Sequence, residues 1–136
     1  MANSLYDKAR NLFASGGIDW GNDTFNVILV DTAVYTVNLS GHNWASDVTG
    51  SAIIAGPNTL TSTQVELNGA ADADDVTFTA VSGDSIEALV IYKFVTNLND
   101  SPLIAYIDTA TGLPITPNGG DIIVTWDNGT NRIFRL

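Results

Sequence analysis

Cysteine, histidine and cationic side chains are scarce in this chain of 136 residues, and each shortage excludes a kind of chemistry. With no cysteine, the chain can form neither a disulfide nor a thiolate metal site, and it has no cysteine nucleophile. The single histidine, His42, would have to serve any Ser-His-Asp triad. Its polar neighbours Ser40, Ser46 and Asp47 are adjacent in sequence, whereas triads are usually assembled from distant segments. We therefore expect no catalytic residue and no enzymatic activity.

Long apolar runs are also missing. No stretch reaches the roughly 18 apolar residues that a membrane span requires. The opening residues 1–5 lack a basic region followed by an apolar stretch, so we expect no secretory signal and synthesis in the cytoplasm. A chain of this length, 45% hydrophobic and 15% charged, can bury a core of its own. The sequence shows no linker or internal repeat, which predicts one domain over residues 1–136.

The charge is strongly acidic. Fifteen acidic and five basic residues give a formal net charge of −10, which disfavours nucleic-acid binding because that affinity comes largely from lysine and arginine. Four of the five cations lie near the two ends of the chain, and they are Lys8, Arg10, Arg132 and Arg135. If the ends meet, these residues form one basic corner on an acidic body. The alternative is that they are solvated and unrelated.

One helix is expected at the start of the chain, over residues 4–14. Ser4 and Asp7 fit a capping box, and apolar residues then recur at helical spacing. Gly16-Gly17 is typical of a helix end. A helical turn is also expected over His42–Val48.

The rest of the sequence predicts β-structure. The apolar run Phe25–Val30 is typical of a strand buried on both faces. Further strands are expected at Ala52–Ala55 and Leu60–Leu67, separated by Gly56-Pro57-Asn58, and at Val76–Ala80, Ala88–Val95, Leu103–Ile107 and Ile122–Trp126. Asp127–Thr130 is expected to form a hairpin turn, after which Arg132–Leu136 returns. This pattern, without a βαβ rhythm, predicts an all-β fold, an antiparallel β-sandwich or jelly roll with one short N-terminal α-helix.

The acidic segment Asp72–Asp75 and the tryptophans are candidate binding sites. Asp72–Asp75 begins like a calcium loop, but the glycine and glutamate positions of such a loop do not match, so a solvated turn is favoured. We expect no metal and no cofactor. Trp126 belongs to an apolar strand face, whereas Trp20 and Trp44 are flanked by loop residues where an interface role is expected.

The sequence also resembles the small decoration (cement) proteins of tailed-phage heads, those of Bordetella phages among them. The resemblance covers most of the chain apart from residues 45–67. It rests on Met1–Arg10, Gly17–Trp20, Val30–Thr32, Tyr35–Val37, Ala73–Phe78, Ile86–Lys93, Leu103–Asp108, Asn118–Asp121 and Trp126–Asp127.

That resemblance implies a jelly-roll homodimer on the outside of the virion, where it clamps neighbouring capsomers of the major capsid protein. It brings no catalytic residue with it. The expected interface residues are Lys8, Arg10, Trp20, Trp44, Arg132, Phe134 and Arg135, and the edge Arg132–Leu136 is expected to pair with a second copy. The alternative is a phage tail module that binds a receptor or carbohydrate, since a β-sandwich alone does not decide function.

Overall fold

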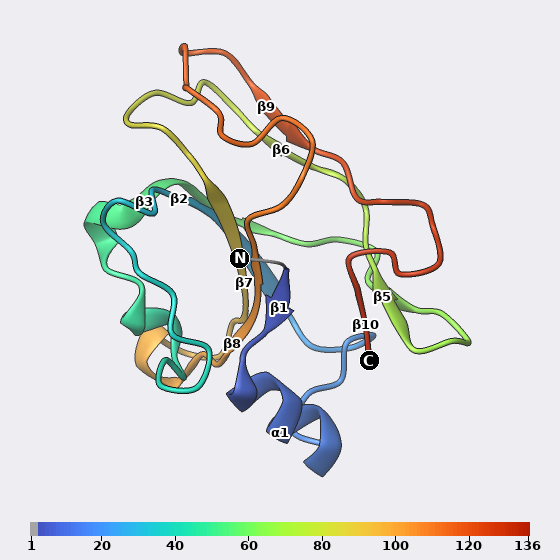
Figure 1. The fold of residues 1–136 in the computed structure, drawn as a ribbon. Coiled ribbons are helices and arrows are strands. Elements are labelled where there is room, and N and C mark those ends of the chain that lie inside the picture. The colour runs from blue at the N-terminus through green and yellow to red at the C-terminus, as the bar shows by residue number, and fades with distance from the viewer. Residues whose placement is uncertain (1–2) are drawn as a thin grey trace.

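A five-stranded antiparallel sheet forms the centre of the molecule in the computed structural model, which describes residues 3–136 (Figure 1). Its strands lie in the order β1-β8-β7-β2-β3. Their bounds are Ser4–Leu5 (β1), Leu103–Ile107 (β8), Ala88–Lys93 (β7), Phe25–Val30 (β2) and Ile53–Thr59 (β3). The protein is thus mostly strands in antiparallel sheets with one helix. Within residues 3–136 no helix is long and apolar enough to cross a membrane.

Two smaller sheets lie over one face of the main sheet. One has the order β10-β5-β4, with bounds Phe134–Arg135, Ala70–Asp72 and Gln64–Val65. The other pairs β6 (Val76–Phe78) with β9 (Ile122–Val124). Apolar side chains from both smaller sheets join those of the main sheet in one buried cluster.

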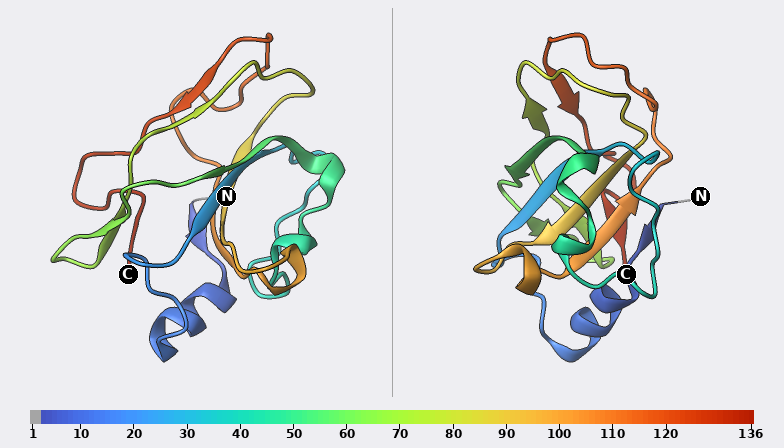
Figure 2. Two further views of the ribbon diagram at one scale, coloured as in Figure 1. Left: turned by 180° about the vertical axis from the view of Figure 1, so that it is seen from behind. Right: turned by 90° about the vertical axis from the view of Figure 1, so that its left-hand side faces the viewer.

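The opposite face of the main sheet is covered mainly by the segment that follows β2. This segment includes two short 3-10 helices, η1 (Ala45–Asp47) and η2 (Gly50–Ala52), and the right-hand view of Figure 2 shows it in front of the sheet. A third 3-10 helix, η3 (Leu98–Asp100), precedes β8. The apolar side chains on this face form a second, separate cluster.

Strand periodicity explains the two clusters. Phe25, Val27 and Leu29 of β2 belong to the first cluster, whereas Ile28 and Val30 belong to the second. All six residues of β2 are buried, as expected for a central strand with both faces covered. The predicted bounds of β2 and of β8 are confirmed.

The helix α1 spans Asp7–Ser15, and its predicted start at Ser4 is wrong. Ser4 and Leu5 instead pair with Tyr106 and Ala105 of β8, and Tyr6 is the N-cap without a side-chain cap bond. A long-range strand pairing has therefore replaced the capping box. The predicted glycine stop is confirmed, because Gly16 has a φ of 81° and closes the helix.

Two expectations about strands are corrected, and one strand was not predicted. Gly56-Pro57-Asn58 does not separate two strands but lies inside β3, an edge strand with register shifts against β2. The expected strand Leu60–Leu67 shrinks to β4, and β5 was not predicted. Alternation in Val76–Phe78 is confirmed, since Thr77 is exposed between two buried neighbours.

The predicted hairpin at Asp127–Thr130 is also wrong. Instead of pairing with each other, β9 pairs with β6 and β10 pairs with β5, both antiparallel. The chain therefore continues past the turn in one direction. Trp126 explains this course, because its backbone N–H donates to the Asp75 carboxylate and its indole N–H donates to the Asp74 carbonyl. These bonds hold the turn against the segment that joins β5 to β6.

Candidate functional site

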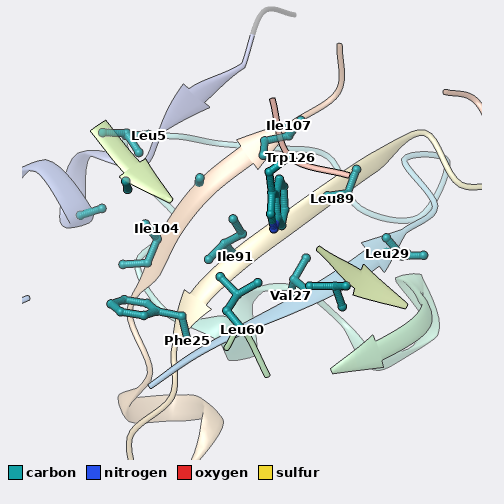
Figure 3. Close-up of a cluster of buried hydrophobic side chains, with 14 of the residues drawn as sticks. Leu5, Phe25, Val27, Leu29, Leu60, Leu89, Ile91, Ile104, Ile107 and Trp126 are labelled. Carbon is teal, nitrogen blue, oxygen red and sulfur yellow. The ribbon is translucent and has the colours of Figure 1, made fainter. Parts of the chain in front are cut away.

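An apolar groove of about 1430 Å³ lies beside strand β1. Its floor is formed by side chains of the main sheet that face the smaller sheets, among them Leu5, Leu89 and Ile107. Figure 3 shows these side chains in the same cluster as Trp126, which also lines the groove. Its walls come from α1 and from the C-terminal segment that contains β9 and β10.

Three cations line this groove, namely Arg10, Arg132 and Arg135. They come from both ends of the chain, which meet here because Phe13 of α1 packs edge-on against Phe134 of β10, with ring centroids 5.8 Å apart. Three of the four cations of the expected basic corner therefore line one groove. Phe134, another expected interface residue, is half-buried in the same wall.

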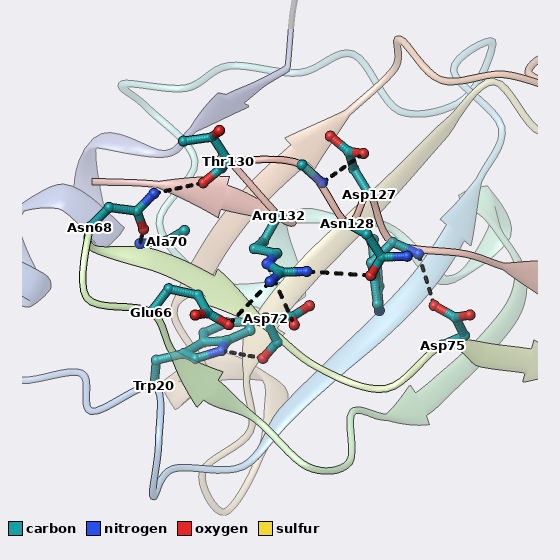
Figure 4. A network of polar contacts seen from close by, with 12 residues as sticks. Trp20, Glu66, Asn68, Ala70, Asp72, Asp75, Asp127, Asn128, Thr130 and Arg132 are labelled. Atoms are coloured by element: carbon teal, nitrogen blue, oxygen red, sulfur yellow. Dashed lines mark hydrogen bonds and ion pairs between the residues drawn. The ribbon is translucent and has the colours of Figure 1, made fainter.

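The three arginines differ in how far their charges are neutralised. Arg10 lies 3.1 Å from the Asp7 carboxylate. Arg132 lies 3.6 Å from Glu66 and 3.9 Å from Asp72, as Figure 4 shows. The Arg135 side chain donates only to the backbone carbonyl of Asn68 at 3.1 Å, and no carboxylate within residues 3–136 forms an ion pair with it. Arg135 is thus the groove cation that is available to an outside carboxylate.

Lys8 lies elsewhere. Its ammonium group sits over the ring of Trp44, 4.9 Å from the ring centroid, and neither residue lines the groove. A cation over an indole face is attracted by the negative charge of the π-system. The structure therefore separates Lys8 and Trp44 from the three arginines with which they were grouped.

Trp20 is in the core rather than at the surface. It is 3% exposed, stacks on Phe25 with centroids 4.2 Å apart, and donates its indole N–H to the Asp72 carbonyl. Trp126 is 6% exposed, as its position on an apolar face predicted. With two of the three indoles buried, the aromatic side chains do not form an exposed platform of the kind that stacks against sugars.

The acidic segment Asp72–Asp75 acts as a connector between β5 and β6. Its backbone carbonyls accept both buried indole N–H groups, and Asp75 accepts the backbone N–H of Trp126. Asp72 faces Arg132. Across the described part of the chain, no three aspartate, glutamate or histidine side chains gather in a way that could hold a metal ion.

His42 ends a chain of hydrogen bonds that reaches the core. Its Nδ1 lies 2.9 Å from the Tyr35 hydroxyl, which lies 2.8 Å from the buried Tyr6 hydroxyl. Burial raises the pKa of Tyr35 to about 12, and burial together with the hydrogen bond to Tyr35 raises the pKa of Tyr6 well above its usual range. Both tyrosines are therefore neutral near pH 7.

Two of the three polar neighbours of His42, Ser40 and Asp47, form hydrogen bonds with other residues. The Ser40 hydroxyl donates to the side chain of Asn38, and Asp47 accepts the backbone N–H groups of Asn43 and Trp44. Asp47 thus caps the helix η1. The partner that the structure gives to His42 is Tyr35, which sequence reasoning did not single out.

Sequence reasoning also missed the groove and Ile123. In β9 the flanking Ile122 and Val124 are half-buried, but Ile123 is 65% exposed and lines the groove. The signal was present in the sequence: three consecutive branched apolar residues in a strand cannot all face one covered side.

A comparison with protein-family models gives no match, and a comparison with curated proteins gives none either.

Proposed function

We propose that this chain is a structural virion protein that decorates the outside of a tailed-phage head and cements neighbouring capsomers of the major capsid protein. The fold is then a jelly-roll sandwich in which the smaller sheets form the second layer. The family resemblance of the sequence motivates the proposal, and the apolar groove with its arginines supplies a surface suited to binding a protein partner.

The observation that carries the proposal is the distribution of charge. The chain has five cationic residues and a net charge of −10, yet three of the five cations line one apolar groove. Apolar area supplies affinity, whereas matched charges mainly set the encounter rate and the register of binding. An acidic partner segment would be attracted to these cations on an otherwise acidic protein, and to Arg135 above all, which has no carboxylate partner among residues 3–136.

Binding to an assembled capsid shell is favoured by mass action and by high effective concentration. A protein that binds only the assembled lattice stabilises that lattice by mass action. Identical contacts repeated over a shell act at high effective concentration, so each contact can be modest. A net charge of −10 keeps free copies soluble and away from DNA.

The copy number in purified virions tests the proposal directly. A decoration protein is present in many copies that scale with the capsid subunits, and we expect quantitative mass spectrometry to find this ratio. A few copies per virion would instead assign the chain to a tail, which is the alternative of a receptor- or carbohydrate-binding module. Absence from virions would reject both.

Reversing the charge of Arg135 tests the role of the groove in shell binding. Arg135→Glu and the control Lys8→Glu lower the net charge of −10 by the same amount, but only Arg135 lines the groove. We expect Arg135→Glu to weaken binding to undecorated shells by about tenfold and to flatten its salt dependence. Lys8→Glu should bind almost as the unmodified protein does. Equal losses in the two variants would contradict docking through the groove.

We further propose that two copies associate through the free edge of β10. This strand lies at the edge of its sheet, and among residues 3–136 it pairs only with β5. Sedimentation equilibrium should detect a dimer that weakens when Phe134 is replaced by aspartate. A monomer at all concentrations, together with separated copies on the shell, would reject the homodimer.

A further inference from the structure

The strands β9 and β10 together form one long, interrupted edge. Ile122 pairs with Phe78 and Val124 with Val76, and further along Phe134 pairs with Ala71. Both strands therefore run antiparallel to the segment β5–β6. The other side of β5 is occupied by β4, and β6 contacts β3. Within residues 3–136, β9 and β10 each pair with no second strand.

The register of β6 and β9 indicates which way the Ile123 backbone points. In an antiparallel pair, directly opposed residues alternate between exchanging two hydrogen bonds and exchanging none. The carbonyl of Thr77, which opposes Ile123, accepts from the side chain of Asn58 on β3. Because this bond directs the Thr77 carbonyl toward β3, the pair Thr77–Ile123 is inferred to have no mutual bonds. The Ile123 N–H and C=O are then directed away from β6, toward the open edge.

Beyond this edge, side chains of β1 and β8 line the groove. Leu5, Ala105 and Ile107 are among them and are 2–9% exposed. One more strand placed beside β9 would lie in the groove against these side chains. A strand in that position has an unpaired backbone on one side, an apolar floor beneath it and Arg135 in the same groove.

We propose that the groove binds an extended segment of the partner protein, which adds as a strand beside β9. Its backbone pairs with Ile123, its inward-facing alternate side chains are apolar and contact Ala105 and Ile107, and a carboxylate contacts Arg135. This is strand addition at a sheet edge, in which backbone bonds give affinity and alternate side chains give specificity. The identification of the partner as the capsid subunit rests on the proposed function. The apolar and acidic character of the bound segment is argued from the residues that line the groove.

A segment from a different protein fits better than a second copy does. Residues 3–136 belong to one folded body, so a second copy has no described free strand to donate without unfolding. A mobile acidic segment of another protein can enter the groove without such unfolding.

The test uses a short synthetic peptide of about nine residues, a common strand length, with alternating valine and threonine and two aspartates at one end. A matched peptide ends in two lysines. Calorimetry should detect binding of the acidic peptide to the unmodified chain and binding of the lysine peptide that is weaker by about tenfold. Absence of binding, or equal binding of both peptides, would overturn the proposal.

Two variants at one position separate strand pairing from apolar contact. Ile123→Pro removes the outward N–H, which a proline at a free edge position allows without loss of a bond to β6. Ile123→Thr keeps that N–H and removes most of the apolar surface. We expect the proline variant to lose binding by about tenfold or more, and the threonine variant to lose it by about threefold or less. Equal losses would show that the backbone does not pair.

Hydrogen exchange on the unmodified chain avoids any dependence on how the proline variant folds. The Ile123 amide should exchange rapidly alone and slowly with the acidic peptide, whereas protection confined to other segments would overturn the proposal. The same measurement on chains bound to undecorated shells distinguishes the two hypotheses. Failure to bind shells would reject the proposed function, whereas binding without protection of Ile123 would reject strand addition alone. If self-association protects Ile123 and the peptide does not compete, the occupant is a second copy and the proposal is wrong.

Discussion

The two faces of the main sheet are covered in different ways. One face is covered by irregular chain, residues 31–52 with their short 3-10 helices, and yet the cluster beneath it is sealed. Tyr6, Val30, Ala52, Ala88, Val90 and Leu103 of this cluster are each 0% exposed. The other face is covered by regular strands and still opens into the groove. A core is therefore closed by covering its whole apolar area, whether or not the covering segment has regular secondary structure.

Buried polar side chains beneath the sealed face have hydrogen-bond partners within the protein. The Tyr6 hydroxyl bonds to Tyr35, and the Asn26 side chain bonds to Tyr92 and Thr59. No buried side-chain nitrogen or oxygen in the described residues lacks a partner. At the groove, by contrast, the Arg135 guanidinium forms no ion pair with a carboxylate of residues 3–136. The polar groups beneath the sealed face are satisfied within the protein, whereas the groove contains a cation without a carboxylate partner among these residues.

A matched pair of leucine substitutions gives the largest test of this contrast. Leu103 is 0% exposed on the sealed face, and Leu136 is 63% exposed at the groove. Leu103→Ala should lower the free energy of unfolding by about 3 kcal/mol through lost burial and a cavity. Leu136→Ala should cost less than about 0.5 kcal/mol. Chemical denaturation measures both, and similar costs would remove the distinction between the faces.

The tyrosine chain gives a smaller effect with a pH dependence. Tyr6→Phe removes one buried hydrogen bond and should cost about 1 kcal/mol at pH 7. The folded-state pKa of Tyr6 and of Tyr35 lies above the unfolded value of about 10. Their contribution is therefore complete below pH 10 and is lost as pH rises toward the folded pKa.

Denaturation at successive alkaline pH values measures this loss. The unmodified chain should lose stability progressively above about pH 10, and Tyr6→Phe should lose it less steeply, because one suppressed tyrosine is gone. Parallel curves for the two proteins would show that Tyr6 does not contribute to alkaline unfolding.

The smallest expected effect on stability concerns the hydrogen bonds of Glu87 with Thr32 and Ser85, which we call the rim of the sealed face. Glu87 accepts bonds from the Thr32 backbone N–H and hydroxyl and from the Ser85 hydroxyl, which ties the end of β2 to the start of β7. Burial alone would raise the Glu87 pKa, but these hydrogen bonds outweigh it and lower the pKa. Its stabilisation is thus present above the unfolded pKa and is lost as pH falls through the folded one.

Glu87→Gln should cost about 1 kcal/mol or less at pH 7, and the difference from the unmodified chain should shrink toward pH 3. Ser85→Ala serves as the control that removes only one of the donors. A cost for Glu87→Gln that stays constant with pH would mean that its charge does not hold the rim.

Local signals in the sequence predicted the elements that depend on local chemistry. The buried run of β2, the bounds of β8 and the glycine at the end of α1 are confirmed for that reason. The failures all involve partners far away in sequence. Ser4 pairs with Tyr106 rather than capping a helix, and Trp126 bonds to Asp74 and Asp75 rather than letting the chain turn back.

The candidate site shows the same limit. The positions of the cations near the chain ends led to two alternatives, a basic corner of four cations or unrelated solvated residues, and three of the four, Arg10, Arg132 and Arg135, line one groove. Nothing local indicated that Lys8 turns toward Trp44, or that Trp20 is enclosed by Phe25 and Phe134. The groove could not be predicted, since it results from the different widths of sheets whose pairing is long-range.

The burial of Trp126 has a practical consequence. Its indole is 6% exposed, is fixed by the carbonyl of Asp74 and lines the groove, whereas Trp20 is enclosed on the far side of β10 and Trp44 lies beside Lys8. With Trp20 and Trp44 replaced by phenylalanine, the intrinsic fluorescence of the protein would come from Trp126. A molecule entering the groove would then change the emission wavelength or quantum yield of that indole. The protein thus contains an optical reporter of the groove that needs no added label.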